Sequence, residues 1–440
     1  MFRKEEKGKQ MLVLGSVLLI YIIVTGFNAT SIAIMLPAWA AEFSLTDVQI
    51  GLLGGGISLG ALVTVFVSGI IYDKVKNFKN LYFLMLIVNG VLIALRYFAT
   101  DFSQIYLLIF LYGVTTSFVG TGGYKLLPQW FDSKSLYVAL GMVTSGGSIG
   151  YILGFLVTPA ANATIGWANL FLWQGIIILI IGIILIFIIP FKKETEGAMN
   201  KDMNVDVEQY TLSRKIKEIF KSKQVWKSIG ADFLMAGCVL SLSQVGPIAL
   251  IFYWGIDQAT AGLILSSSSF GSLVGYWVVP TIINKIGYRK RVFVPAGIIG
   301  LILLMTPILT KNMTAAMILL VAGGFLNACS LLGPRSIMME HPTVAGVKAG
   351  TASGILLTTN KVACVFYPVF FMSLFHGGAN FLPAWFIMFI IAIVGVVFIA
   401  ISDETGPKGR AKLYAKYNIP IPDELKEKAV PEAKPEAEAE

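Results

Sequence analysis

The sequence predicts an all-α integral membrane protein in which twelve transmembrane helices form two pseudo-symmetric six-helix bundles. Three observations support this fold class. Only 13% of the 440 residues are charged and 56% are hydrophobic, whereas soluble domains contain about 25% charged residues. Apolar stretches recur along the whole chain, and each is long enough to cross a hydrocarbon core of about 30 Å as a helix. Finally, the two halves of the chain repeat each other at a fixed offset.

Twelve apolar stretches follow one another, separated by short polar connections. The first comes after the basic segment MFRKEEKGKQ and has no small-residue cleavage site. We therefore expect a retained membrane anchor and not a signal peptide. The predicted spans are residues 11–36, 48–72, 79–99, 104–127, 136–160, 167–190, 228–254, 258–283, 291–309, 313–338, 348–374 and 381–402.

Lys and Arg are concentrated in every second connection, which explains the net charge of +9 without nucleic-acid binding. They cluster in the N-terminus and in residues 73–80, 192–227 and 284–291, and the alternate loops contain only Lys311. Basic loops stay in the cytoplasm. The sequence therefore predicts a multi-pass protein of the cell inner (plasma) membrane with both termini cytoplasmic.

The long basic segment in the middle divides the chain into matching parts. Its stretch LSRKIKEIFKSKQVW places apolar residues at helical spacing among lysines, which is typical of an amphipathic helix on a membrane surface. A calmodulin-type target helix is the alternative. The expected parts are a cytoplasmic N-terminus (1–10), an N-terminal bundle (11–190), the linker (191–227), a C-terminal bundle (228–402) and a cytoplasmic tail with a disordered end (403–440).

The repeat is clearest where residues 51–76 align with residues 262–287 without gaps, at an offset of 211 and with nine identities in 26 positions. Gly51 and Gly262 coincide in this alignment, as do Lys74 and Lys285. Two parallel six-helix repeats around an axis along the membrane normal describe a transporter that rocks around a site at mid-membrane.

Two loops at equivalent places in the halves share a polar helix end and basic residues. The residues concerned are Gly69, Asp73 and Lys74 in the first half and Asn284, Lys285, Gly287 and Arg289 in the second. This pattern is similar to the loop between helices 2 and 3 of the major facilitator superfamily, which the chain resembles over residues 10–406. The resemblance implies a conformational motif in which Asp73 engages basic groups when the cytoplasmic side is closed. A solvated interfacial acid is the alternative.

Lys361 stands in the middle of the eleventh predicted span, about 20 Å from its start at a rise of 1.5 Å per residue. A lysine at that depth costs at least about 2.5 kcal/mol. Gly354, Thr358 and Cys364 form a small or polar stripe on its face of the helix. We therefore expect Lys361 and Thr358 to face a cavity and contact substrate. Partnering of Lys361 with backbone carbonyls and a wrongly placed span are the alternatives.

Three further cations lie in predicted spans. Lys125 and Arg335 are related by an offset of 210 and lie near the cytoplasmic mouth. There they either form an inner gate with acids such as Asp73, Asp132 or Glu340, or attract anions into the cavity. Arg96 lies three residues from the outer end of the third span, and we expect it to snorkel to the interface.

Uncharged polar residues occur in the first and seventh spans, which line the cavity in the superfamily that the chain resembles. These candidate substrate contacts are Tyr21, Asn28, Ser241 and Gln244. Hydrogen bonding between helices is the alternative for each. The cysteines Cys238, Cys329 and Cys364 fall within spans and are interpreted as core residues, so no disulfide, metal or cofactor is expected.

Acidic residues are expected to be absent from the depth of the spans, because Asp232 stands near the start of the seventh and Glu340 at the end of the tenth. Buried charge that is only positive favours an anionic substrate. The sequence thus predicts a monomeric secondary active transporter that moves a small organic anion, a carboxylate above all, by alternating access, as an antiporter or a proton symporter. It is not expected to be an enzyme, because no nucleotide-binding loop or metal cluster is present.

Subgroup resemblances leave the substrate open. A lysine in the middle of helix 11 resembles the oxalate/formate antiporter group, and the glycine-rich fifth span resembles nitrate, nitrite and cyanate carriers. A carrier of neutral or hydrophobic compounds, such as a sugar or drug exporter, is the alternative.

Overall fold

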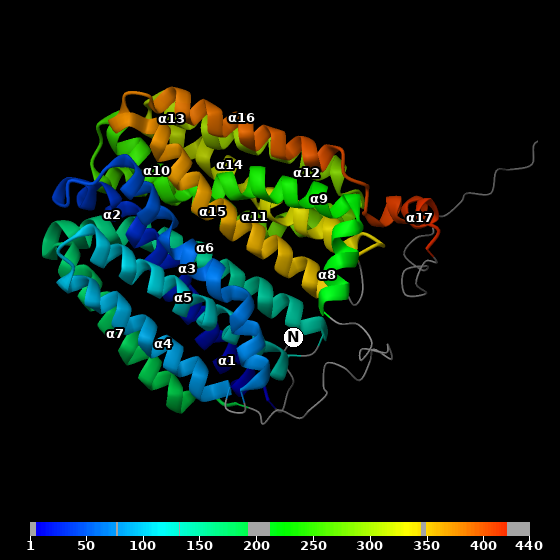
Figure 1. Ribbon diagram of the computed structural model, residues 1–440, viewed down its shortest axis with the longest axis horizontal. Coiled ribbons are helices and arrows are strands. Elements are labelled where there is room, and N and C mark those ends of the chain that lie inside the picture. The colour runs from blue at the N-terminus through cyan, green and yellow to red at the C-terminus, as the bar shows by residue number, and fades with distance from the viewer. Residues whose placement is uncertain (1–5, 76–77, 132, 192–211, 345–348, 420–440) are drawn as a thin grey trace, which may run out of the picture.

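The computed structural model describes residues 6–75, 78–131, 133–191, 212–344 and 349–419. Within those residues, twelve helices are long and apolar enough to cross a membrane, as predicted. Figure 1 shows two groups of helices side by side, with the first half of the chain at the bottom and the second half at the top. The predicted disordered end of the tail, residues 420–440, lies outside the described residues.

The first half begins with a single long span in three parts, because a π-helical segment separates two α-helices. Short 3-10 turns end the third and fourth spans. The elements of this half are α1 (Lys7–Ile20), η1 (Tyr21–Phe27), α2 (Asn28–Glu42), α3 (Asp47–Lys74), α4 (Phe78–Ala94), η2 (Leu95–Phe98), α5 (Phe102–Leu126), η3 (Leu127–Gln129), α6 (Ser133–Ile165) and α7 (Trp167–Ile188).

The second half repeats this plan after the amphipathic helix α8 (Leu212–Lys221), which was predicted. Its first span starts at Lys223, earlier than the expected residue 228. The remaining elements are α9 (Lys223–Ala231), η5 (Asp232–Gly237), α10 (Cys238–Trp254), α11 (Gln258–Ile286), α12 (Lys290–Met305), α13 (Pro307–Thr310), α14 (Met313–Glu340), α15 (Ala349–Phe375), η7 (His376–Gly378), α16 (Phe381–Ala400) and α17 (Pro407–Lys416).

The two π-helical segments occupy equivalent places in the repeat. The segment η1 starts at Tyr21 and η5 starts at Asp232, and 232 − 21 gives the offset of 211 found in the sequence. A π segment locally widens a helix and is frequently found at functional sites. The internal repeat therefore extends to this irregularity in the first and seventh spans.

The helix bundle has two distinct ends. Figure 1 shows the N-terminus, α8 and α17 at one end, which we call the basic end. At the opposite end the two halves touch directly. Gly51 of α3 packs so closely against α15 that a Cβ atom added to it would lie 2.7 Å from Cα of Val369. Hydrogen bonds also join the halves there, from Gln258 Nε2 to the carbonyl of Ile34 (3.2 Å) and from the amide of Gly377 to Asp47 (2.8 Å). The structure is thus closed at the opposite end.

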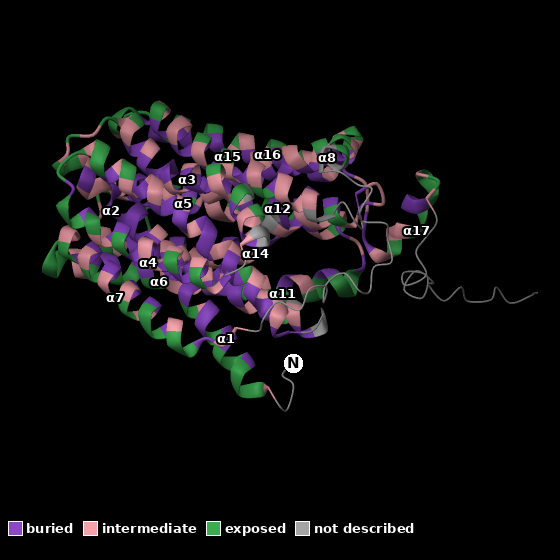
Figure 2. Cartoon of the chain, turned by 60° about the horizontal axis from the view of Figure 1, so that its bottom comes forward, coloured by how far each residue is buried: buried purple, intermediate pink, exposed green. Residues whose placement is uncertain are grey.

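The outer surface of the bundle is apolar. Large side chains such as Phe187, Ile318 and Ile390 are 60 to 83% exposed, and Figure 2 shows exposed residues along the outward sides of the helices and buried residues between them. An apolar surface of this extent suits contact with acyl chains. The chain is therefore a multi-pass membrane protein.

Candidate functional site

A cavity lies between the two halves. Helices α2, α3 and α6 of the first half and α10, α11, α14 and α15 of the second half contribute to its wall. Its polar lining consists of Thr30, Ser58, Ser148, Tyr151, Ser243, Gln244, Ser268, Ser269, Ser272, Tyr276, Asn327, Asn360 and Lys361.

Lys361 is the cation of this cavity. It lies about 18 Å along α15 from Ala349, at a rise of 1.5 Å per residue, and its side chain is half-buried. No hydrogen bond or ion pair joins it to another residue in the part of the chain that the structure describes. None of the described side chains around the cavity is acidic. A half-buried ammonium group at membrane depth, with no acidic side chain in the described lining, is a strong electrostatic feature, because an opposite charge would stabilise it.

Two amide side chains of the cavity are incompletely bonded. Gln244 Oε1 and Asn360 Nδ2 are buried and have no hydrogen-bond partner among the described residues. Most buried polar groups in folded proteins have a hydrogen-bond partner. These two atoms are therefore candidates to bond to a bound ligand, or to other side chains in another conformation of the transporter. Gln244 was predicted from the sequence, whereas Asn360 was missed. The available signal was its position four residues before Cys364, a member of the polar stripe.

Hydroxyl groups from the second half were also missed. The run Ser266–Ser269 in α11 contributes Ser268 and Ser269 to the cavity, and Ser272 and Tyr276 follow on the same helix. The signal was the run SSSSFG itself, since four successive serines are unusual in an apolar span. The cavity wall is therefore polar mainly on the side of the second half.

Four predicted substrate contacts lie outside the lining of this cavity. Thr358 and Ser241 donate to carbonyls of their own helices, Gly354 (2.9 Å) and Gly237 (2.7 Å). Tyr21 packs edge-on against the ring of Tyr124. Asn28 is fully buried and bonds to other helices, which is the alternative that the sequence left open.

The predicted snorkelling of Arg96 is wrong. Its side chain is 0% exposed, because its guanidinium donates to Asn28 Oδ1 (3.0 Å) and lies between the rings of Tyr112 and Phe171, 4.9 and 5.0 Å away. Asn28 in turn donates to Gln174 Oε1 (2.8 Å). The ring faces and the amide oxygen replace the interfacial water expected from the sequence. The complementary polar residues of spans one, three and six were the overlooked signal.

The expected absence of a deep acid is also wrong. Asp232 is 0% exposed in η5, because its helix begins at Lys223 and carries the residue further into the span than predicted. Arg335 Nε lies 4.0 Å from Asp232 Oδ1, and Glu340 pairs with Arg289. The inner gate expected from Arg335 and Lys125 stays a prediction. Lys125 donates to the carbonyl of Tyr72 (2.6 Å). The side chains of Asp73 and Asp132 lie outside the described residues.

The second copy of the loop motif forms a compact polar cluster at the basic end. Arg289 bonds to Glu340 through Nε (3.0 Å) and Nη2 (2.5 Å) and to Asn284 Oδ1 (3.3 Å). Gly287 ends α11 with a φ of +75°, which favours glycine. Glu404 accepts from the amides of Arg289 (2.7 Å) and Lys290 (3.0 Å), at the N-terminus of α12. An acid of the tail thus engages a helix N-terminus in this half.

Other motif residues are less informative. Lys285 lies in the last turn of α11. Gly69 lies in α3, and a Cβ atom added there would have no neighbouring atom within 4 Å. The side chains of Asp73 and Lys74 lie outside the described residues, so the latch predicted for the first half stays a prediction.

Several curated proteins are similar to the chain. A probable hexose phosphate transport protein of Chlamydia trachomatis is 23% identical over 66% of this chain and 67% of that protein. A probable 4-methylmuconolactone transporter of Cupriavidus pinatubonensis is 24% identical over 70% and 72%, respectively. A probable nitrate transporter of Staphylococcus epidermidis is 22% identical over 67% and 72%. These relatives are all transporters of small molecules.

Solved structures share the fold. The nucleoside transporter NupG superposes with a TM-score of 0.69 at 14% identity, over 88% of this chain and 98% of that one. A bacterial homologue of the human lysosomal transporter Spinster, in an inward-facing and occupied conformation, gives 0.68 at 15% identity over 93% and 98%. The family model of the Major Facilitator Superfamily matches residues 18–368. With its twelve spans, its two-bundle fold and this match, the chain belongs to the major facilitator superfamily and is a transporter of small molecules.

Proposed function

We propose that this protein is a secondary active transporter that carries a small organic anion, a carboxylate, across the cell inner membrane by alternating access. The basic end is the cytoplasmic side in this proposal, because Lys and Arg accumulate on the side that is not translocated. The protein acts as a monomer in lipid, with Lys361 as the principal contact of the substrate. Transport is either exchange of anions or symport with a proton.

The observation that carries the proposal is the state of Lys361. Its ammonium group faces a cavity between the halves, with no acidic side chain in the described lining. A lysine at membrane depth costs at least about 2.5 kcal/mol, and a carboxylate bound beside it would offset part of that cost. Asn360 Nδ2 adds an amide donor without a partner among the described residues, which suits a carboxylate oxygen, whereas the unpaired Gln244 Oε1 is an acceptor and would bond a hydroxyl or ammonium donor.

The relatives support an anion as substrate at a coarser level. Hexose phosphate and nitrate, which are named for two of them, are both anions. They differ greatly in size, so the substrate of this chain has to be argued from its own cavity. The closed contact between α3 and α15 at the opposite end fits one state of an alternating-access cycle.

The proposal is tested by ligand-induced stabilisation of the purified full-length protein. Wild type, Lys361→Gln and the control Lys311→Gln would be heated with formate, oxalate, benzoate, nitrate, glucose 6-phosphate, glucose or tetraphenylphosphonium. Lys311 is an exposed cation at the opposite end of the bundle, so its substitution changes the net charge equally.

We expect at least one carboxylate to raise the melting temperature of wild type and Lys311→Gln but not of Lys361→Gln. Equal stabilisation of all three proteins by that carboxylate would exclude Lys361 as its ligand. Stabilisation by glucose or tetraphenylphosphonium alone would instead indicate a carrier of neutral or hydrophobic compounds. Stabilisation by nitrate alone would indicate a carrier of inorganic anions.

A further inference from the structure

We propose that the substrate site has two parts, and that the cargo is an amphipathic carboxylic acid. Its carboxylate lies at Lys361 and its hydrocarbon or aromatic part enters an apolar chamber inside the C-terminal bundle. This inference rests on the proposed function and adds to it the chemical class of the substrate.

The apolar chamber is lined by helices of the second half, with Phe155 of α6 at its edge. Most of its wall is aliphatic or aromatic. The lining residues used below are Leu242, Gly246, Leu250, Leu265, Met305 and Trp385.

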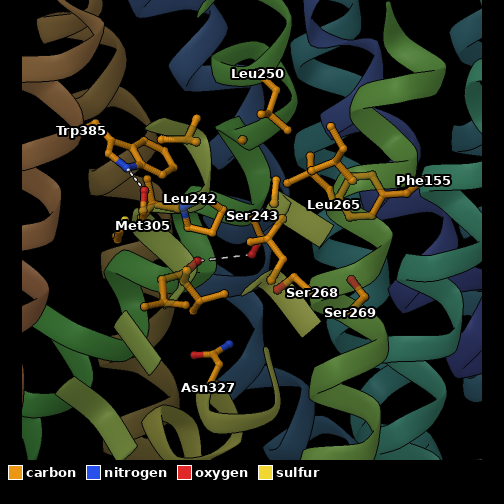
Figure 3. Close-up of a pocket in the computed structure, with 18 residues that line it drawn as sticks. Phe155, Leu242, Ser243, Leu250, Leu265, Ser268, Ser269, Met305, Asn327 and Trp385 are labelled. Carbon is orange, nitrogen blue, oxygen red and sulfur yellow. Dashed lines mark hydrogen bonds between the residues drawn. The ribbon is translucent and has the colours of Figure 1, made fainter. Parts of the chain in front are cut away.

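The apolar chamber adjoins the central cavity. Phe155, Ser243, Ser268, Ser269 and Asn327 line both spaces. Figure 3 shows the polar side chains of Ser268, Ser269 and Asn327 in the lower part of the apolar chamber and those of Leu250 and Trp385 in its upper part. A ligand that spans the shared residues would thus meet polar groups towards the cavity and apolar groups further in.

Two polar side chains of the chamber wall, Trp385 and Ser243, are bonded within the protein. Trp385 Nε1 donates to the carbonyl of Met305 (2.9 Å), and Ser243 Oγ donates to the carbonyl of Val239 (3.3 Å). Both contacts are visible in Figure 3. The inner part of the apolar chamber therefore offers few partners to the hydroxyl groups of a sugar, and burying such groups without partners is unfavourable. A methylene chain or an aromatic ring suits it better.

The equivalent region of the first half is filled. The offset of 211 pairs Leu250 with Trp39 (250 − 211 = 39). Trp39 is 0% exposed, and its ring stacks on that of Phe171 at 5.4 Å. Leucine is much smaller than tryptophan, so the second half keeps a space where the first half is packed. At this pair of positions the second half departs from the internal symmetry towards a smaller side chain.

The test is a series of straight-chain carboxylates from acetate to decanoate, with the matching alcohols, bound to full-length protein in lipid nanodiscs. Burial of each methylene should tighten binding about three- to fourfold, until the apolar chamber is full and the affinity levels off. Leu265→Trp, which fills the chamber, should weaken the long acids at least tenfold and leave acetate unchanged. The matched control is Leu263→Trp on the same helix, because Leu263 is exposed on the outer surface.

Leu265→Ala gives a second readout that does not depend on the folding of the tryptophan variant. It enlarges the apolar chamber, so the affinity should level off at a longer acid than in wild type. An affinity that is flat along the series, while Lys361→Gln still abolishes carboxylate binding, would overturn the two-part site and leave the proposed function standing. If the alcohols bind as tightly as the matching acids, both to wild type and to Lys361→Gln, the contact between Lys361 and a carboxylate is refuted. Binding in the apolar chamber would still be supported.

Discussion

Arg96 donates a hydrogen bond of 3.0 Å to Asn28 Oδ1 in the interior of the N-terminal bundle, and no acidic residue takes part in this contact. Gln174 continues the network by accepting from Asn28 (2.8 Å) and donating to Ser31 (3.0 Å). The contacts connect η2, α2 and α7, which lie far apart in the sequence. A buried cation thus contributes to a polar network that joins these helices.

Replacing Arg96 by Met should lower the free energy of unfolding by about 1–3 kcal/mol, because Asn28 Oδ1 then loses a charge-assisted partner in a buried site. Chemical unfolding in mild detergent measures the change. The control is Arg214→Met on α8, whose side chain is 61% exposed and should contribute less than about 0.5 kcal/mol. The double variant Arg96→Met with Asn28→Leu also removes the unpaired amide, so it should lose less stability than the sum of the two single variants. Losses of unfolding free energy that simply add would contradict this account.

Asp232 and Arg335 should respond unequally to substitution. Arg335→Met leaves the fully buried Asp232 without the cation 4.0 Å away, which should cost about 1–3 kcal/mol, as for an unsatisfied buried polar group. Asp232→Asn should cost less, because the Arg335 side chain is 33% exposed and can be solvated. Unfolding of the two single variants and the double variant measures the difference. A larger loss in Asp232→Asn than in Arg335→Met would show that the pair does not dominate this site.

The closed contact at the opposite end should depend on Gly51. Leucine at this position would meet Cα of Val369 in α15 and should favour states that open at this end. Cys364 lines the cavity, so its labelling by a membrane-impermeant maleimide on intact cells reports the opening, in a background of Cys238→Ala and Cys329→Ala. We expect labelling to increase several-fold.

Gly15→Leu is the control for this experiment. Gly15 lies in α1, is exposed, and a Cβ atom added there would have nothing within 4 Å, so the variant should leave Cys364 labelling as in the parent protein. Equal labelling of the Gly51→Leu and Gly15→Leu variants would argue against Gly51 as part of the closure.

Arg289→Gln should destabilise the basic end by about 1.5–3 kcal/mol, because Glu340 loses two charge-assisted hydrogen bonds. The neighbouring Lys290→Gln is the control, since only the backbone amide of Lys290 bonds to Glu404 (3.0 Å) among the contacts of the described residues. Hydrogen exchange at residues 284–293 would detect the loosening. Unchanged exchange in Arg289→Gln would contradict a structural role for this cluster.

Asp403 bonds to His341, Lys416 and Tyr417. Acidification should destabilise this cluster in two ranges of pH. Burial lowers the pKa of His341 from 6.5, and hydrogen bonding to Asp403 opposes this only in part. Burial also tends to raise the pKa of Asp403, but hydrogen bonds from Lys416, Tyr417 and His341 outweigh it and lower that pKa to about 2. Both groups bind protons more weakly in the folded state, so their stabilisation is complete above the unfolded pKa and is lost as the pH falls.

The expected melting temperature is level above about pH 7, decreases as the pH falls below 6.5, and decreases again between pH 3.8 and about 2. Asp403→Asn should remove most of the second decrease. A melting curve whose pH dependence is the same in wild type and Asp403→Asn would exclude Asp403 from this linkage.

The twelve spans, the internal repeat and the depth of Lys361 could all be predicted from the amino-acid sequence. Hydropathy and helix length are local properties, because the backbone in a bilayer has to bond within each helix. The offset of 211 also relates the two helix irregularities that begin at Tyr21 and Asp232.

Which polar side chains contact one another across helices could not be predicted from the sequence and depends on the packing of the helices. The helical period fixes the face on which Asn28 or Arg96 lies, but the neighbour that covers this face depends on how the helices are rotated and placed along their axes. For the same reason, Asp232 could not be recognised as a buried partner of Arg335. The apolar chamber is likewise a property of the tertiary structure. The size of Leu250 alone does not predict a cavity, because the space left depends on the side chains packed around it, as it does around Trp39 in the first half.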